Sequence, residues 1–135
     1  MKVGCVKEIK KQEYRVGMTP DNVKSYVNAG HTVYIEAGAG EGSGFEDSEY
    51  SAAGALLCAD PGEVWEKSDM VIKVKEPLPE EYGYFREGLV LYTYFHLAAD
   101  EKLTDALLDA GVKSVAYETL IEKNGYLGGM ATAGL

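Results

Sequence analysis

The chain has 135 residues and carries 13 basic against 22 acidic side chains, a net charge of −9. A chain with this charge lacks the positive footprint that nucleic acids and anionic membrane surfaces require, so we expect neither as a partner. No stretch approaches the roughly 18 consecutive apolar residues of a membrane span, and the first residues lack the layout of a signal peptide. We therefore expect a cytoplasmic protein whose partner is a small molecule.

Short apolar runs alternate with helical patterns along the chain, which is typical of βαβ units. The runs predict strands at residues 2–6, 32–35, 55–58, 70–74, 89–94 and 112–116. The length suits one domain with a sizeable core. We expect an α/β fold: a mostly parallel, Rossmann-like open sheet with helices on both faces, in a single domain.

Capping residues mark the predicted helices between these strands. The first helix has Thr19 as N-cap, Pro20 in its first turn and Gly30 as its stop. Later helices are predicted to begin near Asp47, after Asp60 and after Asp100.

The two cysteines and the glycine-rich segments predict no redox, metal or phosphate site. Cys5 and Cys58 fall in predicted strands without Cys-x-x-Cys spacing, so we expect reduced core residues and no bound metal. The loop at residues 37–44 has Ser43 and Phe45 where a dinucleotide fingerprint needs a third glycine, so its glycines are interpreted as structural. Residues 129–134 have glycine spacing like that of a P-loop but lack the lysine and hydroxyl that hold phosphate and Mg²⁺.

Three side chains fall where such a sheet places its chemistry. His96 closes the apolar run that begins at residue 89, and Lys75 ends the preceding strand just before Pro77, which cannot continue a central strand. Arg15 lies in the connection between the first strand and the first helix. We expect all three to converge on an anionic small molecule.

Several segments of the chain resemble one protein family. The first half contains Val6-Lys7-Glu8-Ile9-Lys10, Arg15-Val16, Thr19-Pro20, Ala29-Gly30-His31, Glu36-Ala37-Gly38-Ala39-Gly40 and Gly42-Ser43-Gly44-Phe45. The second half contains Val74-Lys75-Glu76-Pro77-Leu78-Pro79-Glu80-Glu81-Tyr82, Tyr94-Phe95-His96-Leu97-Ala98 and Ala116-Tyr117-Glu118-Thr119. Over residues 1 to about 122, these segments together resemble the N-terminal, substrate-binding domain of bacterial L-alanine dehydrogenases.

The resemblance implies reversible oxidative deamination of L-alanine to pyruvate and ammonia with NAD, by a full-length enzyme that is a homo-oligomer. In that family the residue that matches His96 is the acid/base group, and those that match Arg15 and Lys75 bind the substrate. The residue types suit these roles. A guanidinium grips a carboxylate through two parallel hydrogen bonds, an ammonium polarises a keto oxygen, and an imidazole moves protons near neutral pH. Glu118 follows a predicted strand and is expected to support these residues without touching the substrate.

The chain departs from the family in two places. The family continues into a Rossmann domain that binds NAD and carries a catalytic aspartate, and that domain is absent from these 135 residues. Residues 123–135 are expected to be a divergent or truncated tail, in which Ala131 and Thr132 replace the family's serine and glutamate if Met130 is its methionine. We therefore expect the chain alone to be inactive, with its own cofactor-binding residues unassigned.

Two other interpretations stay open. The α subunit of proton-translocating transhydrogenase is similar over the first half but lacks the His-Leu-Ala segment at residues 96–98, so the chain is alternatively a nucleotide-binding module of that kind. The second alternative is a non-catalytic domain whose function is self-association.

Overall fold

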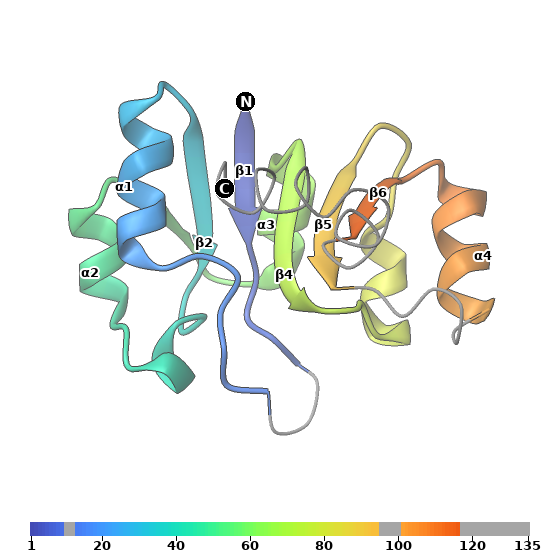
Figure 1. Cartoon of the computed structure of the whole chain (residues 1–135), viewed down its shortest axis with the longest axis horizontal. Coiled ribbons are helices and arrows are strands. Elements are labelled where there is room, and N and C mark those ends of the chain that lie inside the picture. The colour runs from blue at the N-terminus through green and yellow to red at the C-terminus, as the bar shows by residue number, and fades with distance from the viewer. Residues whose placement is uncertain (10–12, 95–100, 117–135) are drawn as a thin grey trace, which may run out of the picture.

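The structure, a computed structural model, describes residues 1–9, 13–94 and 101–116 (Figure 1). Within these residues six strands form one sheet in the order β3-β2-β1-β4-β5-β6, and every neighbouring pair is parallel. The predicted open parallel sheet is confirmed, with strand boundaries that differ from the prediction by no more than one residue. The strands are β1 (Lys2–Cys5), β2 (Thr32–Glu36), β3 (Leu56–Cys58), β4 (Met70–Lys75), β5 (Val90–Tyr94) and β6 (Lys113–Ala116).

Helices cover both faces of the sheet, as predicted. Val23 of α1 and Tyr50 of α2 pack with Val3 on one face, whereas Trp65 of α3 and Leu103 of α4 pack in a second cluster on the other face. Because each face is covered, the central strands are apolar on both sides. The described helices are α1 (Pro20–Asn28), α2 (Asp47–Ala52), α3 (Pro61–Lys67), α4 (Glu101–Ala110) and the two 3-10 helices η1 (Glu41–Ser43) and η2 (Pro79–Tyr84).

The helix starts agree with the sequence prediction except at α2. Thr19 caps α1 and Asp60 caps α3, where its carboxylate accepts the N–H of Glu63 at 2.9 Å. The N-cap of α2 is Glu46, one residue before the predicted Asp47. The carboxylate of Asp47 instead accepts the N–H of Gly38 at 2.8 Å, a contact nine residues distant in the chain.

Some predictions concern residues outside the described ranges, and two observed helices were not predicted. Asp100, the predicted cap of α4, and the tail at residues 123–135 lie outside the described residues, as does the predicted domain boundary at residue 122. The two 3-10 helices have no counterpart in the sequence prediction, because a single turn lacks the repeated apolar spacing that marks a longer helix.

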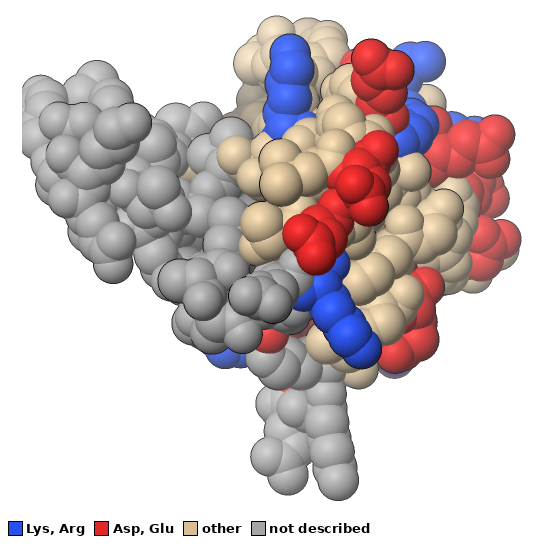
Figure 2. All heavy atoms as spheres, turned by 90° about the vertical axis from the view of Figure 1, so that its right-hand side faces the viewer, with Lys and Arg blue, Asp and Glu red and all other residues tan. Residues whose placement is uncertain are grey.

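The α4 end of the molecule carries both kinds of charge. Leu103 and Leu107 are buried, whereas Lys102, Asp105 and Asp109 face outward. Figure 2 shows acidic and basic side chains interspersed over this face. No helix among the described residues is both long enough and apolar enough to cross a bilayer.

Both cysteines are buried free thiols in the core, as predicted. Cys5 of β1 is fully buried, and this burial raises the pKa of its thiol to about 12, with a further contribution from the charge of Glu8. Burial also raises the pKa of Cys58. Because the thiolate is the reactive form, neither residue has the character of a nucleophile.

The order of the strands determines where a ligand site forms. The chain builds outward from β1 to β2 and β3, then returns to place β4 on the other side of β1. At such a switch point the connections leave the sheet in opposite directions, so a crevice opens outside the carboxyl ends of the two central strands. Here these strands are β1 and β4, and Figure 1 shows the long connection from β1 to α1 extending beyond that edge of the sheet.

Gly4 of β1 tests the close packing of α3 against the sheet. A Cβ at this position would lie 2.0 Å from Ser68 Oγ and 2.7 Å from Val64 Cγ1. We expect Gly4→Ala to lower the free energy of unfolding by about 1–3 kcal/mol, measured by urea denaturation, because the core must move to admit the methyl group. Gly83→Ala is the matched control, since nothing lies within 4 Å of its added Cβ. Equal stability of the two variants would contradict this packing.

Candidate functional site

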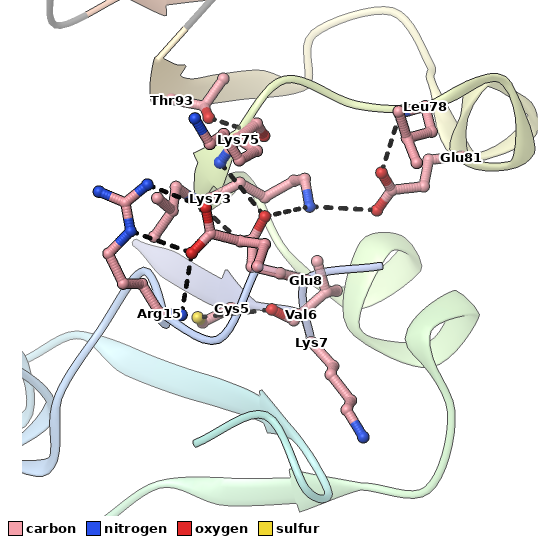
Figure 3. Close-up of polar contacts among 12 residues, drawn as sticks. Cys5, Val6, Lys7, Glu8, Arg15, Lys73, Lys75, Leu78, Glu81 and Thr93 are labelled. Atoms are coloured by element: carbon pink, nitrogen blue, oxygen red, sulfur yellow. Dashed lines mark hydrogen bonds and ion pairs between the residues drawn. The ribbon is translucent and has the colours of Figure 1, made fainter. Parts of the chain in front are cut away.

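Two of the predicted site residues lie at the switch point. Lys75 is the last residue of β4, and Arg15 lies in the connection between β1 and α1. Their side chains reach the same end of a polar network (Figure 3). His96 and Glu118 lie outside the described residues, so their predicted roles remain predictions.

Arg15 is held by Glu13, a neighbour that the sequence analysis did not single out. Arg15 Nε donates to Glu13 Oε2 at 3.0 Å, and the NH2 group of Arg15 donates to Glu13 Oε1 at 2.9 Å. The backbone N–H of Arg15 also donates to Glu13 Oε2, at 2.9 Å. The Glu13 side chain is only 6% exposed, whereas that of Arg15 is 65% exposed. The carboxylate is thus the buried anchor, and the guanidinium faces solvent.

The electrostatics of Glu13 link Arg15 to Lys75. The hydrogen bonds from Arg15 are the main reason why the pKa of Glu13 falls to about 2, and the positive charge of Lys75 lowers it further. Both predicted substrate-binding cations therefore act on the same carboxylate, which is ionised throughout the neutral pH range. The convergence of Arg15, Lys75 and His96 on one ligand stays a prediction.

The backbone of Lys75 is fixed from both neighbouring strands. Its N–H donates to Glu8 Oε1 at 3.2 Å, and its carbonyl accepts a hydrogen bond from Thr93 Oγ1 of β5 at 3.0 Å. The preceding N–H, from Val74, donates to Glu8 Oε2 at 3.0 Å. One carboxylate thus satisfies two backbone donors where β4 ends, and the start of the Lys75 side chain is held in place.

The buried ammonium group of Lys73 supports this arrangement. Lys73 Nζ lies 3.1 Å from Glu8 Oε1 and 3.4 Å from Glu81 Oε2 (Figure 3), and the three side chains are 1%, 2% and 5% exposed, respectively. The second oxygen of Glu81 accepts the N–H of Leu78 at 3.1 Å. Burial raises the pKa of Glu81, and the charge of Lys73 opposes that shift. The network ties the connection after β1 to β4 and to η2.

The sequence carried one signal for this network that the prediction did not use. Lys73 sits between Ile72 and Val74 in a central strand that is covered on both faces, where an ammonium must find a carboxylate partner. Glu8 and Glu81 are 65 and 8 positions away from it, and no spacing rule identifies such partners.

The open space at this edge is a pocket of about 450 Å³. Its volume lies within the range of small-molecule sites. Acidic and basic side chains line it together with the glycine loop: Lys7, Glu8, Glu13, Tyr14, Arg15, Ala39, Glu41 and Gly42.

The glycine loop has a structural role, as predicted. Gly38 and Gly44 adopt positive φ angles of 85° and 84°. Gly42 lies against the segment that carries Arg15, since a Cβ there would be 2.7 Å from the carbonyl oxygen of Tyr14. The hydroxyl of Ser43 donates to that same oxygen at 2.8 Å. The loop therefore supports one wall of the pocket.

The first turn of α1 does not offer a phosphate site. In dinucleotide-binding folds the pyrophosphate rests on the N–H groups that open the first helix. Here Thr19 Oγ1 accepts the N–H of Asn22 at 3.2 Å, Asn22 Oδ1 accepts the N–H of Thr19 at 3.0 Å, and Pro20 has no N–H to give. The polar side chains of Thr19 and Asn22 already pair with backbone N–H groups at this helix start, so the start of α1 does not fit the pyrophosphate of NAD.

Removing the buried ammonium tests the network directly. We expect Lys73→Met to lower the free energy of unfolding by about 3–5 kcal/mol, because two buried carboxylates lose their cation. Burial already raises the pKa of Glu81 above its ordinary value, and without the opposing charge of Lys73 that pKa rises further. The loss should therefore be greater at pH 8 than at pH 5.

Urea denaturation of the two proteins at both pH values gives this comparison. Lys67→Met is the control, since Lys67 pairs with Glu63 at 3.0 Å on an exposed helix surface and its loss should leave stability nearly unchanged. A Lys73→Met protein as stable as the control at pH 8 would contradict the account of the network.

Comparison with known proteins agrees with the fold. The family profile described as "Alanine dehydrogenase/PNT, N-terminal domain" matches residues 4–132. The alanine dehydrogenase of Bacillus subtilis (strain 168) is 57% identical over 122 residues, which cover 90% of this chain and 32% of the relative. The chain thus spans about a third of the length of this curated relative.

Two solved structures share the fold. An L-alanine dehydrogenase superposes with a TM-score of 0.85 at 48% identity, over 87% of this chain and 32% of that one. A transhydrogenase from Sinorhizobium meliloti superposes with a TM-score of 0.82 at 31% identity, over 89% of this chain and 34% of that one. The sequence is closer to the alanine dehydrogenase than to the transhydrogenase. The chain belongs to the alanine dehydrogenase/PNT N-terminal domain family.

Proposed function

We propose that this chain is the substrate-binding portion of an NAD-dependent L-alanine dehydrogenase, which converts L-alanine reversibly to pyruvate and ammonia. The observation that carries the proposal is the pocket at the switch point of the sheet, which is lined by Arg15 and by Glu8, the carboxylate that accepts the N–H of Lys75. The 57% identity to an alanine dehydrogenase supports this substrate over others that bear a carboxylate. The lower identity to the transhydrogenase makes a nucleotide-binding module the weaker candidate.

Arg15 binds the carboxylate of alanine or pyruvate in this proposal. Its guanidinium lines the pocket and is mostly exposed, while its backbone and one edge of its head group are fixed by Glu13. A planar guanidinium suits a carboxylate because two parallel hydrogen bonds set both distance and orientation. A substrate held in this way has its reacting carbon at a defined place.

Lys75 acts on the other end of the substrate. The ammonium polarises the keto oxygen of pyruvate, which stabilises negative charge that develops there. Its backbone is fixed by Glu8 on one side and by Thr93 on the other. This fixation reduces the reorganisation needed when the substrate reacts.

His96 is the acid/base group in this proposal, on the basis of the family resemblance. Tyr94 of β5 pairs with Lys75 of β4, and His96 follows Tyr94 by two residues. A span of two residues limits the distance between the Cα atoms of Tyr94 and His96 to about 7 Å, which supports a place for His96 near Lys75. An imidazole there exchanges the proton that the interconversion of amine and ketone requires.

NAD accepts the hydride in this reaction, and we assign its binding to the two thirds of the relatives' length that this chain does not match. The cytoplasmic location and the homo-oligomer expected for the full-length enzyme belong to the same proposal. The 135-residue chain should therefore bind pyruvate weakly and should produce no alanine-dependent NADH.

Calorimetric titration of the purified chain separates the candidate functions. We expect weak heats with pyruvate that are lost in Arg15→Ala, because the guanidinium supplies the carboxylate contact. Tight binding of NADH without pyruvate binding would favour the transhydrogenase-like module. Concentration-dependent association with neither ligand bound would favour a self-association domain.

A chimera tests the catalytic role of His96. Residues 1–122 of this chain would replace the corresponding segment of the Bacillus subtilis enzyme, and alanine-dependent NADH formation would be followed by absorbance. We expect His96→Ala to lower kcat by on the order of 10²–10⁴, since an acid/base group contributes about that much. The kcat/KM should fall together with kcat, whereas Arg15→Ala should also raise KM for L-alanine. A stable His96→Ala chimera with unchanged kcat would remove His96 from the mechanism.

A further inference from the structure

The contact between Glu13 and Arg15 joins two side chains of very different exposure. Glu13 is nearly buried and Arg15 is mostly exposed, although the two are joined by three hydrogen bonds. A pair that served only stability at the surface would leave both groups to solvent and would contribute little. Here the Glu13 carboxylate is the buried partner, and its position restricts where the exposed Arg15 guanidinium can lie.

The geometry of the fork defines how Arg15 is presented. Glu13 takes the edge of the guanidinium formed by Nε and one terminal nitrogen. These two bonds use two of the five N–H donors, and they fix the plane of the group. The guanidinium is mostly exposed beside the pocket, where Arg15 is proposed to bind the substrate carboxylate in a defined orientation. A rotation of the guanidinium would spoil that alignment.

The segment that carries both residues is itself supported. Tyr14, between them, accepts the hydroxyl of Ser43 through its carbonyl at 2.8 Å, and Gly42 permits the close approach. Glu13 also lies within the influence of the Lys75 charge. Its carboxylate, whose pKa is lowered mainly by the hydrogen bonds from Arg15, is ionised at neutral pH.

We propose that Glu13 is a positioning residue of the substrate site: it sets the plane of the Arg15 guanidinium, so that Arg15 engages one small carboxylate substrate. This inference rests on the proposed function, because it takes Arg15 and Lys75 as the groups that bind alanine and pyruvate. Glu13 itself does not touch the substrate. It acts through Arg15, and its loss should affect substrate binding without a matching loss of stability.

The same contact is compatible with an opposite role for Glu13, and the experiment must distinguish the two roles. If the Glu13 carboxylate occupied the place of the substrate carboxylate on Arg15, it would compete with the substrate. Replacing Glu13 would then lower KM for pyruvate. A positioning role predicts the reverse, because Arg15 would lose its fixed orientation.

The test uses the chimera of residues 1–122 with the Bacillus subtilis enzyme and two variants of Glu13. Glu13→Gln keeps the shape of the side chain but removes its charge and places an amide N–H₂ against an N–H donor. Glu13→Asp keeps the charge with a shorter reach. Glu63→Gln is the matched control, since it breaks a carboxylate–cation pair of similar length on the surface of α3.

We expect Glu13→Gln to lower kcat/KM for pyruvate by about 10- to 100-fold, mainly through KM, because a misplaced binding group costs productive orientation. KM for NADH should stay unchanged, and the urea midpoint should move no further than in the control. Glu13→Asp should recover part of the loss. A lowered KM for pyruvate, an unchanged kcat/KM, or a loss fully accounted for by unfolding would each overturn the inference.

The parent chimera distinguishes a failure of this inference from a failure of the proposed function. If the parent chimera does not oxidise L-alanine, the proposed function fails and the inference falls with it. If the parent is active and Glu13→Gln matches it, only the positioning role of Glu13 is wrong.

Discussion

The buried ammonium of Lys73 is the interaction on which the site depends. Its partners, Glu8 and Glu81, come from the connection after β1 and from η2, so one cation of β4 joins η2 to a segment that is 65 positions away in the sequence. Burying charges is costly unless each is paired and hydrogen-bonded, and here the carboxylates also accept backbone N–H groups. The network therefore fixes the ends of the two central strands at the one place where the fold opens a crevice.

The substrate-binding residues proposed for the pocket are supported outward from this network. Glu8 connects Lys73 to the backbone of Lys75, and Lys75 in turn acts on Glu13, which holds Arg15. The glycine loop supports the Arg15 segment from the other side. Arg15 is exposed and Lys75 is half-buried, whereas the acidic side chains behind them are less exposed: Glu8, Glu13 and Glu81. Because the acidic side chains hold the cations in place, this arrangement suits a site that recognises a small anion.

The sequence predicted the sheet well because parallel central strands are covered on both faces and appear as short apolar runs between helix caps. It also predicted that Arg15, Lys75 and His96 converge at the carboxyl ends of parallel strands, which stays a prediction because His96 lies outside the described residues. The acids behind them were missed. Glu8 pairs with Lys73 across 65 positions, and Glu13 resembles any solvated loop residue until the structure shows it buried. Glu46 rather than Asp47 caps α2, because Asp47 is used by a distant backbone N–H.

The central claim is that the pocket beside Arg15 and Lys75 binds a small carboxylate. The most direct measurement is a titration of the ¹⁵N-labelled chain with pyruvate, followed by backbone amide chemical shifts. The account predicts concentration-dependent shifts that cluster at residues 13–15, 42–43 and 74–75 and that are absent in Arg15→Ala. Shifts confined to a second pocket, which Trp65 of α3 and Tyr84 of η2 help to line, or shifts that persist unchanged in Arg15→Ala, would contradict it.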